Sequence, residues 1–190
     1  MITRKRLIVA ISLLLVALLG VGLAWQITSV NKRWPAATAH LVEPGTQLVF
    51  NGLGITALDA ELLNGGQLRE RIKSTKARSD LTEEGIRVLV ATVEVVNDTD
   101  SPQVFPLEGF SLVSGAWSAV PDRDLMRMLA PGQGVDPTVA PRARQVITMA
   151  APLRSDAFSV DAWRHLDQRE FVVSSRGYPD SYQFLLPKAG

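Results

Sequence analysis

The sequence contains no cysteine, and this absence excludes several kinds of chemistry at once. Disulfides, thiolate metal sites, cysteine nucleophiles and a lipid-modified N-terminal cysteine all require a thiol. A chain of 190 residues can be stable without disulfides, because a domain of this size buries a large fraction of its surface on folding. The sequence therefore predicts one domain that is held together by packing alone.

Histidine is scarce as well, since His40 and His165 are the only two in the chain. Two isolated imidazoles rarely build a metal site, and the sequence has no Gly-x-Ser-x-Gly elbow that would mark a nucleophilic serine. Asp98 and Asp100 offer oxygen ligands to Ca²⁺, but a solvated turn explains the same residues without a metal. We therefore expect no catalytic, metal or cofactor-binding residues and no cofactor.

The chain also lacks a strong excess of charge of one sign. It has 20 basic and 19 acidic residues, and Arg4, Lys5 and Arg6 precede the first hydrophobic residues. Setting these three aside leaves 17 basic against 19 acidic residues, a balance of about −2. Nucleic-acid binding needs a basic surface that neutralises phosphates, so we expect no nucleic-acid partner.

One long hydrophobic run is present, from Leu7 to Trp25, and it contains no charged residue. As a helix it would reach about 28 Å, which is close to the thickness of a bilayer core. Basic residues before the run favour a cytoplasmic N-terminus. The sequence thus predicts a cytoplasmic segment at 1–6 and a single membrane helix at 7–27 in the bacterial plasma membrane. Leu7 to Trp25 would contact membrane lipid, and the rest of the chain would lie outside the cytoplasm.

The alternative to an anchor is a signal peptide that is cleaved after Ala24. Gly22 and Ala24 are small residues at the positions that signal peptidase inspects, but the bulky Trp25 directly after them makes a poor cleavage context. An uncleaved anchor is therefore favoured. Gly20 and Ala24 lie four residues apart, a spacing that allows close packing against another helix.

After the run, Pro, Gly and small residues without a sustained period predict a linker at 28–45, followed by an extracytoplasmic domain at 46–190. Ile86–Val96 is apolar on both faces and rich in β-branched residues, which predicts a central strand, with Arg87 at the head of one face. Turn-forming residues separate the other apolar stretches. Further strands are expected within 47–63, 103–113, 116–120, 144–151, 171–174 and 182–186, and short helices at 122–129 and 160–166.

Five basic residues within ten positions are the least ordinary polar feature of the chain: Arg69, Arg71, Lys73, Lys76 and Arg78. Such a group is a candidate contact for anionic lipid headgroups or for an acidic partner. The alternative is a solvated surface loop whose charges are offset by acidic residues that follow directly, namely Asp80, Glu83 and Glu84.

The strand Ile86–Val96, the turn at 97–100, the Phe110-Ser111-Leu112-Val113 stretch and the Ala130-Pro131-Gly132 turn together carry a resemblance. They resemble the immunoglobulin-like extracytoplasmic domains of Gram-positive secreted and membrane-anchored proteins, of the mycobacterial secreted immunogenic antigen type. The resemblance and the spacing of the strands imply an all-β, immunoglobulin-like antiparallel β-sandwich with one or two short helices, preceded by one transmembrane helix.

These features lead us to expect a membrane-anchored, extracytoplasmic, non-enzymatic interaction module of the bacterial cell envelope, with an envelope protein as its partner. Two alternatives stay open. The first is a small-ligand binder or an envelope hydrolase whose site is built from distant segments and cannot be read from sequence. The second is an accessory or assembly subunit of a membrane complex.

Overall fold

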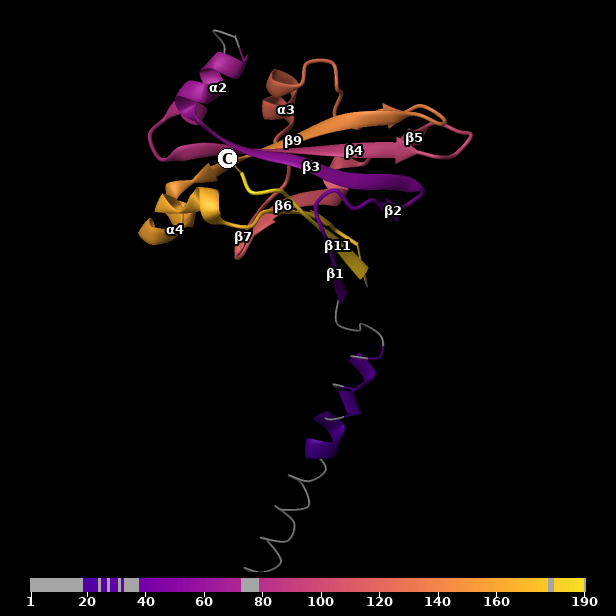
Figure 1. Ribbon diagram of the computed structural model, residues 1–190. Helices are drawn as coiled ribbons and strands as arrows, with labels where there is room; N and C mark the ends of the chain where they lie inside the picture. The colour runs from indigo at the N-terminus through magenta and orange to yellow at the C-terminus, as the bar shows by residue number, and fades with distance from the viewer. Residues whose placement is uncertain are drawn as a thin grey trace, which may run out of the picture. The chain divides into compact units, whose positions relative to one another are not determined.

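The computed structural model describes residues 19–23, 25–26, 28–30, 32, 38–72, 79–177 and 180–189. The chain divides into two compact units, Met1–Thr38 and Ala39–Gly190. In the first unit the described positions between 19 and 32 are helical (Figure 1). Within the described part of the chain, no helix is both long enough and apolar enough to span a membrane. The predicted membrane helix and cytoplasmic segment fall largely on residues outside the described ones, so both stay predictions.

The second unit is mostly β-sheet with a few short helices, as the sequence predicts. The strands are β1 (Thr38–Val42), β2 (Leu48–Phe50), β3 (Leu53–Asn64), β4 (Ile86–Asn97), β5 (Gln103–Val104), β6 (Phe110–Ser114), β7 (Trp117–Ala119), β8 (Thr138–Val139), β9 (Arg144–Arg154), β10 (Val172–Ser175) and β11 (Asp180–Leu185). The α-helices are α2 (Gly65–Ile72), α3 (Arg123–Leu129) and α4 (Val160–Arg164), and four 3-10 turns lie at Ser79–Thr82, Leu107–Gly109, Ser155–Ala157 and Leu166–Gln168.

The strands form two main sheets that pack face to face as a β-sandwich (Figure 1). One sheet has the order β2-β3-β4-β9 and the other the order β1-β11-β10-β6-β7, while β5 and β8 form a small separate pair. Phe50 of β2 contacts Phe110 of β6 edge to face across the interface, with ring centroids 5.8 Å apart. Phe105 stacks on Phe110 from the other side at 4.8 Å. One continuous core therefore joins the two sheets.

Side chains of β4 point alternately to the two faces of its sheet, and apolar residues lie on both faces. Leu89, Val93 and Val95 face the second sheet and are fully buried. Val88 and Val90 face the opposite side and are buried as well, because α2 and α3 cover this end of the sheet. In Figure 1 these two helices lie beyond β3, β4 and β9, on the side away from β6 and β7. The apolar residues on both faces thus reflect two different buried surfaces, one of them made by helices.

Two corrections concern the predicted boundaries. The predicted linker at 28–45 is helical at its described positions between 28 and 32, and it contains strand β1, which pairs beside β11. Val42 of this strand is buried in the core, so the compact unit begins at Ala39 rather than at residue 46. The sequence pattern does not reveal this strand, because the four residues that precede Val42 are all exposed. They therefore lack the alternation of buried and exposed residues by which a strand is predicted, which an edge strand can do without.

The second correction concerns the stretch after β3. A surface loop is expected there, but the structure places the two-turn helix α2 at Gly65–Ile72. Asn64 caps this helix, and Leu68 is its one fully buried residue. The two glycines at the start of the helix have low helix propensity, so the sequence favours a loop. The N-cap and the burial of Leu68 outweigh this low propensity.

Candidate functional site

Helices α2 and α4 lie at the same end of the sandwich (Figure 1). Two adjoining hollows lie at this end. The first has a volume of about 440 Å³, and its lining includes Gln67 of α2, Arg164 of α4 and Ala189, the residue before the last one of the chain. The second, of about 380 Å³, is lined by the start of α2, by the turn before β4 and by Trp163. Asn64 and Arg87 line both, and we call the pair the Arg87 hollow.

The pairing of β3 with β4 places Asn64 and Arg87 side by side. The two residues are directly opposite each other in the antiparallel register, at the last position of β3 and the second position of β4. Both lie on the face that turns toward the second sheet, where Leu89 and Val93 continue the face as core residues. At this end Asn64 is exposed and Arg87 is half-buried, so the face carries a polar pair in place of core residues.

A reciprocal cap fixes the two amide side chains of the hollow. Asn64 Oδ1 accepts hydrogen bonds from the backbone N–H groups of Gly66 and Gln67, both at 3.0 Å. Gln67 Oε1 in turn accepts from the backbone N–H of Asn64 at 2.9 Å. This is the geometry of a capping box, and it occupies the oxygen of each amide. The NH₂ groups of both side chains have no partner among the described residues and are left as donors.

Arg87 is half-buried and lies over the indole of Trp163, with its guanidinium carbon 5.6 Å from the ring centroid. A cation over an aromatic face is attracted by the ring quadrupole and is held in place by it. Trp163 is held in turn by Phe158, whose ring centroid lies 5.9 Å away. The hydroxyl of Ser159 accepts a hydrogen bond from the N–H of Ala162 and so caps α4, the helix that carries Trp163.

The guanidinium of Arg87 differs from those of most other described arginines. Among the residues that the structure describes, it makes no hydrogen bond and no ion pair, although it is half-buried. Arg169 and Arg176 donate to the hydroxyl oxygens of Ser114 and Ser111. Six other described arginines pair with a carboxylate: Arg71 with Glu61, Arg123 with Glu108, Arg127 with Asp124, Arg142 with Asp100, Arg144 with Glu94 and Arg154 with Asp156. Arg164, which also lines the hollow, has no such partner among the described residues either.

The charges around the hollow are mixed. Arg87 and Arg164 supply two positive charges to the larger part, and Asp167 supplies one negative charge. Glu83 and Glu84 line the smaller part. The donors of Asn64, Gln67, Arg87 and Arg164 outnumber the acceptors in the larger part, so this surface is suited to a ligand that accepts hydrogen bonds. The hollow is polar and open, with Leu62 and Trp163 as its large apolar neighbours.

The structure divides the predicted basic group. Arg69 and Arg71 lie on α2, where Arg69 is exposed and Arg71 pairs with Glu61 of β3. Lys73, Lys76 and Arg78 lie outside the described residues. Neither Arg69 nor Arg71 lines the Arg87 hollow, although both follow it closely in sequence. The prediction of a contact with an anionic surface through these residues is not tested by their placement.

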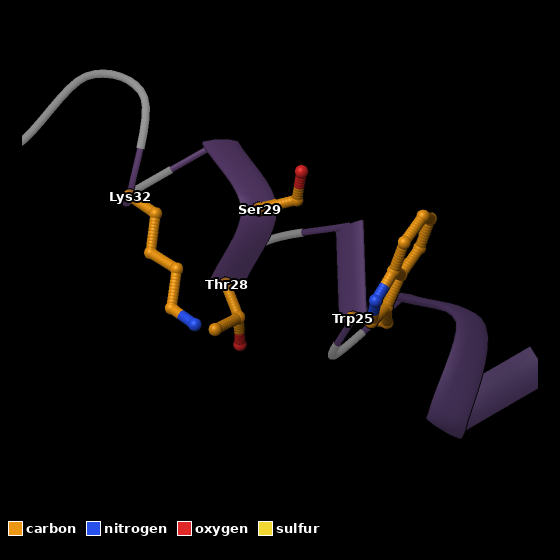
Figure 2. A pocket seen from close by; sticks show the side chains of 4 residues that line it. All are labelled: Trp25, Thr28, Ser29 and Lys32. Atoms are coloured by element: carbon orange, nitrogen blue, oxygen red, sulfur yellow. The ribbon is translucent and has the colours of Figure 1, made fainter.

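In the first unit, Trp25, Thr28, Ser29 and Lys32 line a hollow of about 300 Å³ (Figure 2). Their spacing of three and four residues puts them along one side of a helical segment. All its lining residues belong to this one segment, so the hollow is a groove between neighbouring side chains. Gly20 of the predicted helix-packing pair is helical and exposed, and Ala24 lies outside the described residues.

The two histidines lie far apart in the chain and have separate partners. His40 Nε2 is 2.9 Å from Asp180 Oδ1, and its ring stacks on Tyr182 with centroids 5.2 Å apart. His165 Nδ1 is 3.0 Å from the backbone oxygen of Asp161. Within the described residues, no group of three or more His, Asp or Glu side chains is arranged to hold a metal ion. Asp100 of the predicted turn pairs with Arg142.

Sequence reasoning did not identify the Arg87 hollow. One local signal was present, because Arg87 stands at the head of a strand face that is otherwise apolar. A charged residue on the core side of a central strand requires a partner or an opening. The other lining residues come from α2, which precedes Arg87, and from α4, which follows it by more than 70 residues, and no local pattern connects them.

No family model matches the chain, and no curated protein matches it. Among solved structures, a conserved hypothetical protein from Bacillus anthracis aligns with 75% of this chain and 93% of its own, at 10% identity and a TM-score of 0.48. The alignment with an uncharacterized β-sandwich protein from Clostridium difficile 630 covers 80% of this chain and 96% of that protein, at 10% identity and a TM-score of 0.47. A functionally unknown protein from Listeria monocytogenes EGD-e covers 76% and 81%, at 13% identity and a TM-score of 0.48. Likenesses at this level carry no argument about what the chain does.

Proposed function

We propose that the chain is a membrane-anchored, extracytoplasmic, non-enzymatic interaction module of the bacterial cell envelope, built on an immunoglobulin-like sandwich. The strand order supports the fold part of this proposal. If β3, β4 and β9 are taken as strands A, B and E, and β6, β7, β10 and β11 as C, C′, F and G, the sheets contain the orders A-B-E and G-F-C-C′, with β2 added beside A and β1 beside G. These are the neighbours that immunoglobulin domains have, with strand D missing from the first sheet.

The observation that carries the interaction part is the uncovered half of the β2-β3-β4-β9 sheet. Helices α2 and α3 cover only one end of its outer face. The remainder carries Val49 and Val146, which are 68% and 56% exposed, beside Thr92 and Glu94. A flat β surface with exposed branched side chains is suited to contact with another protein. We call this region the open sheet face.

The anchoring part rests on the charge-free run from Leu7 to Trp25 and on the basic residues before it. A reporter fused after residue 190 tests it directly. Alkaline phosphatase should be active at this position, because it folds only outside the cytoplasm, and green fluorescent protein should stay dark. Fluorescence confined to the cytosolic side would overturn the anchored, exported arrangement.

A photo-crosslinking residue at position 146 tests the interaction part in intact membranes. We expect one discrete adduct from Val146 on the open sheet face and none from a matched position at Arg127, which is exposed on α3. Absence of an adduct at position 146 would contradict the proposal. An adduct with a subunit of a membrane complex would favour the accessory role over a free-standing module.

A further inference from the structure

We propose that the larger part of the Arg87 hollow, which Glu83 and Glu84 do not line, is a binding site for a singly charged oxyanion, a carboxylate or a phosphodiester, on a small hydroxylated ligand. The proposal does not depend on membrane anchoring or on the open sheet face. It concerns the opposite end of the β3–β4 hairpin from Val49, in a part of the molecule that the proposed function does not use.

The first argument is the supply of unused donors. The capping box occupies the side-chain oxygens of Asn64 and Gln67 and leaves their NH₂ groups without a partner among the described residues. The amides cannot flip without breaking the cap, so the hollow presents donors from both. Backbone N–H groups at the start of α2 make no contribution, because Asn64 already binds them.

The second argument is the guanidinium of Arg87. It is half-buried, oriented by Trp163 and without a carboxylate among the described residues. A planar guanidinium in this state is suited to bidentate pairing with a carboxylate or a phosphate, and stacking on an indole lowers the entropy that the side chain loses on binding. Arg164 adds a second guanidinium that has no ion-pair partner among the described residues.

The third argument concerns charge and size. Asp167 lines the same part of the hollow and disfavours a doubly charged anion, while it accepts hydrogen bonds from hydroxyl groups next to a single charge. The volume of about 440 Å³ is in the range of small-molecule sites. Together these features select a monoanion with neighbouring hydroxyl groups, because each of those groups finds a matching partner in the hollow.

Isothermal titration calorimetry of the full chain in nonionic detergent tests the site with three probes. Glucuronate carries the carboxylate, glycerophosphoglycerol carries the phosphodiester, and glucose is the uncharged control. We expect at least one of the two anions to bind with a dissociation constant of about 1 mM, more weakly as salt is raised, and glucose not to bind. Binding of glucuronate alone assigns a carboxylate site, and binding of glycerophosphoglycerol alone assigns a phosphodiester site. No binding of either anion, or equal binding of glucose, overturns the proposal.

Two substitutions decide whether binding occurs in this hollow. Gln67→Glu keeps an oxygen for the backbone N–H of Asn64, and so keeps the capping box, but it replaces the NH₂ donor with a negative charge. We expect it to weaken binding at least tenfold without changing the melting temperature. Gln183→Glu makes the same chemical change on β11, outside the hollow, and should leave binding within twofold. Equal affinities in the wild type and Gln67→Glu would overturn the site.

Asp167→Asn should raise the affinity for the anion, whereas Gln67→Glu should lower it. Removal of the negative charge in the hollow should strengthen binding of the monoanion severalfold and should allow glycerol 3-phosphate, a dianion, to bind. A gain of affinity is not produced by a general loss of structure, so this variant separates a specific site from damage to the fold. Unchanged binding of both ligands would contradict the role given to Asp167.

Discussion

Asn97 is the buried polar residue with the largest hydrogen-bond network of the described chain. Its Nδ2 donates to the backbone oxygens of Ser101, Val139 and Ala140 at 2.8, 3.0 and 3.1 Å. Its Oδ1 accepts from the backbone N–H and the hydroxyl of Thr99 at 3.0 and 2.7 Å. One side chain therefore fixes the turn after β4 and ties it to the end of β8 and to the residue after that strand.

Replacement of Asn97 by alanine should lower the free energy of unfolding by about 2–4 kcal/mol, because several buried backbone groups lose their partner. Urea denaturation measures this loss. Asp98→Ala, at the exposed neighbouring position, is the matched control and should change stability by less than about 0.5 kcal/mol. A loss below 1 kcal/mol in the Asn97 variant would mean that water replaces the network.

At the same scale, the sequence predicted the turn at 97–100 from residue types that bind their own backbone. The long-range bonds from Asn97 to residues 139 and 140 were beyond reach, because they span more than 40 positions. The same holds for Arg87, whose unusual place on a core face was visible in sequence while its neighbours were not.

Strand β9 illustrates how the fold protects an edge. Gln133 binds both backbone groups of Thr148, accepting from its N–H at 2.7 Å and donating to its oxygen at 2.8 Å. Asp122 N–H donates to the oxygen of Ala150 at 2.7 Å. Pro152, further along the same strand, has no N–H to offer. An edge with occupied or missing donors is a poor template for pairing with another chain.

Gln133→Ala should therefore have two effects, a loss of about 1–2 kcal/mol in stability and a greater tendency to self-associate through β9. Urea denaturation measures the first effect and light scattering at high protein concentration measures the second. Gln183→Ala on β11 serves as the control. If the variant is as stable and as monodisperse as the wild type, Gln133 does not protect the edge.

Element prediction was accurate where local signals were strong. The Asn51-Gly52 pair forms the β2–β3 turn, with φ angles of 51° and 81°, as expected of residues that tolerate left-handed backbone. Ser159 caps α4, as its residue type and place before an apolar stretch indicate, and Asp122 caps α3 in the same way. The predicted strand at 103–113 is interrupted after Val104, because Pro106 lacks an N–H for the ladder.

At the scale of the whole molecule, β1 belongs to the second sheet of the sandwich. His40 bonds to Asp180 at 2.9 Å and stacks on Tyr182, and Val42 is 7% exposed. These contacts make β1 part of the second sheet although most of its residues are exposed.

A chain that begins at Ala39 should therefore unfold as the full chain does. A chain that begins at Thr46 loses β1 and should be less stable by about 2–4 kcal/mol, because a core valine and the contacts of His40 are lost. Thermal unfolding followed by circular dichroism compares the two. Equal melting temperatures would place the domain boundary at residue 46, as the composition alone predicts.

The sequence by itself determined the mostly β character, the central strand β4, the turns and the cap at Ser159, because each depends on residues a few positions apart. Tertiary structure alone decided the pairing of β1 beside β11, the helical state of 65–72 and the gathering of Asn64, Gln67, Arg87 and Arg164 in one hollow. These features depend on which distant segments become neighbours, and the free energy of such contacts is set by burial and register, which no local pattern contains.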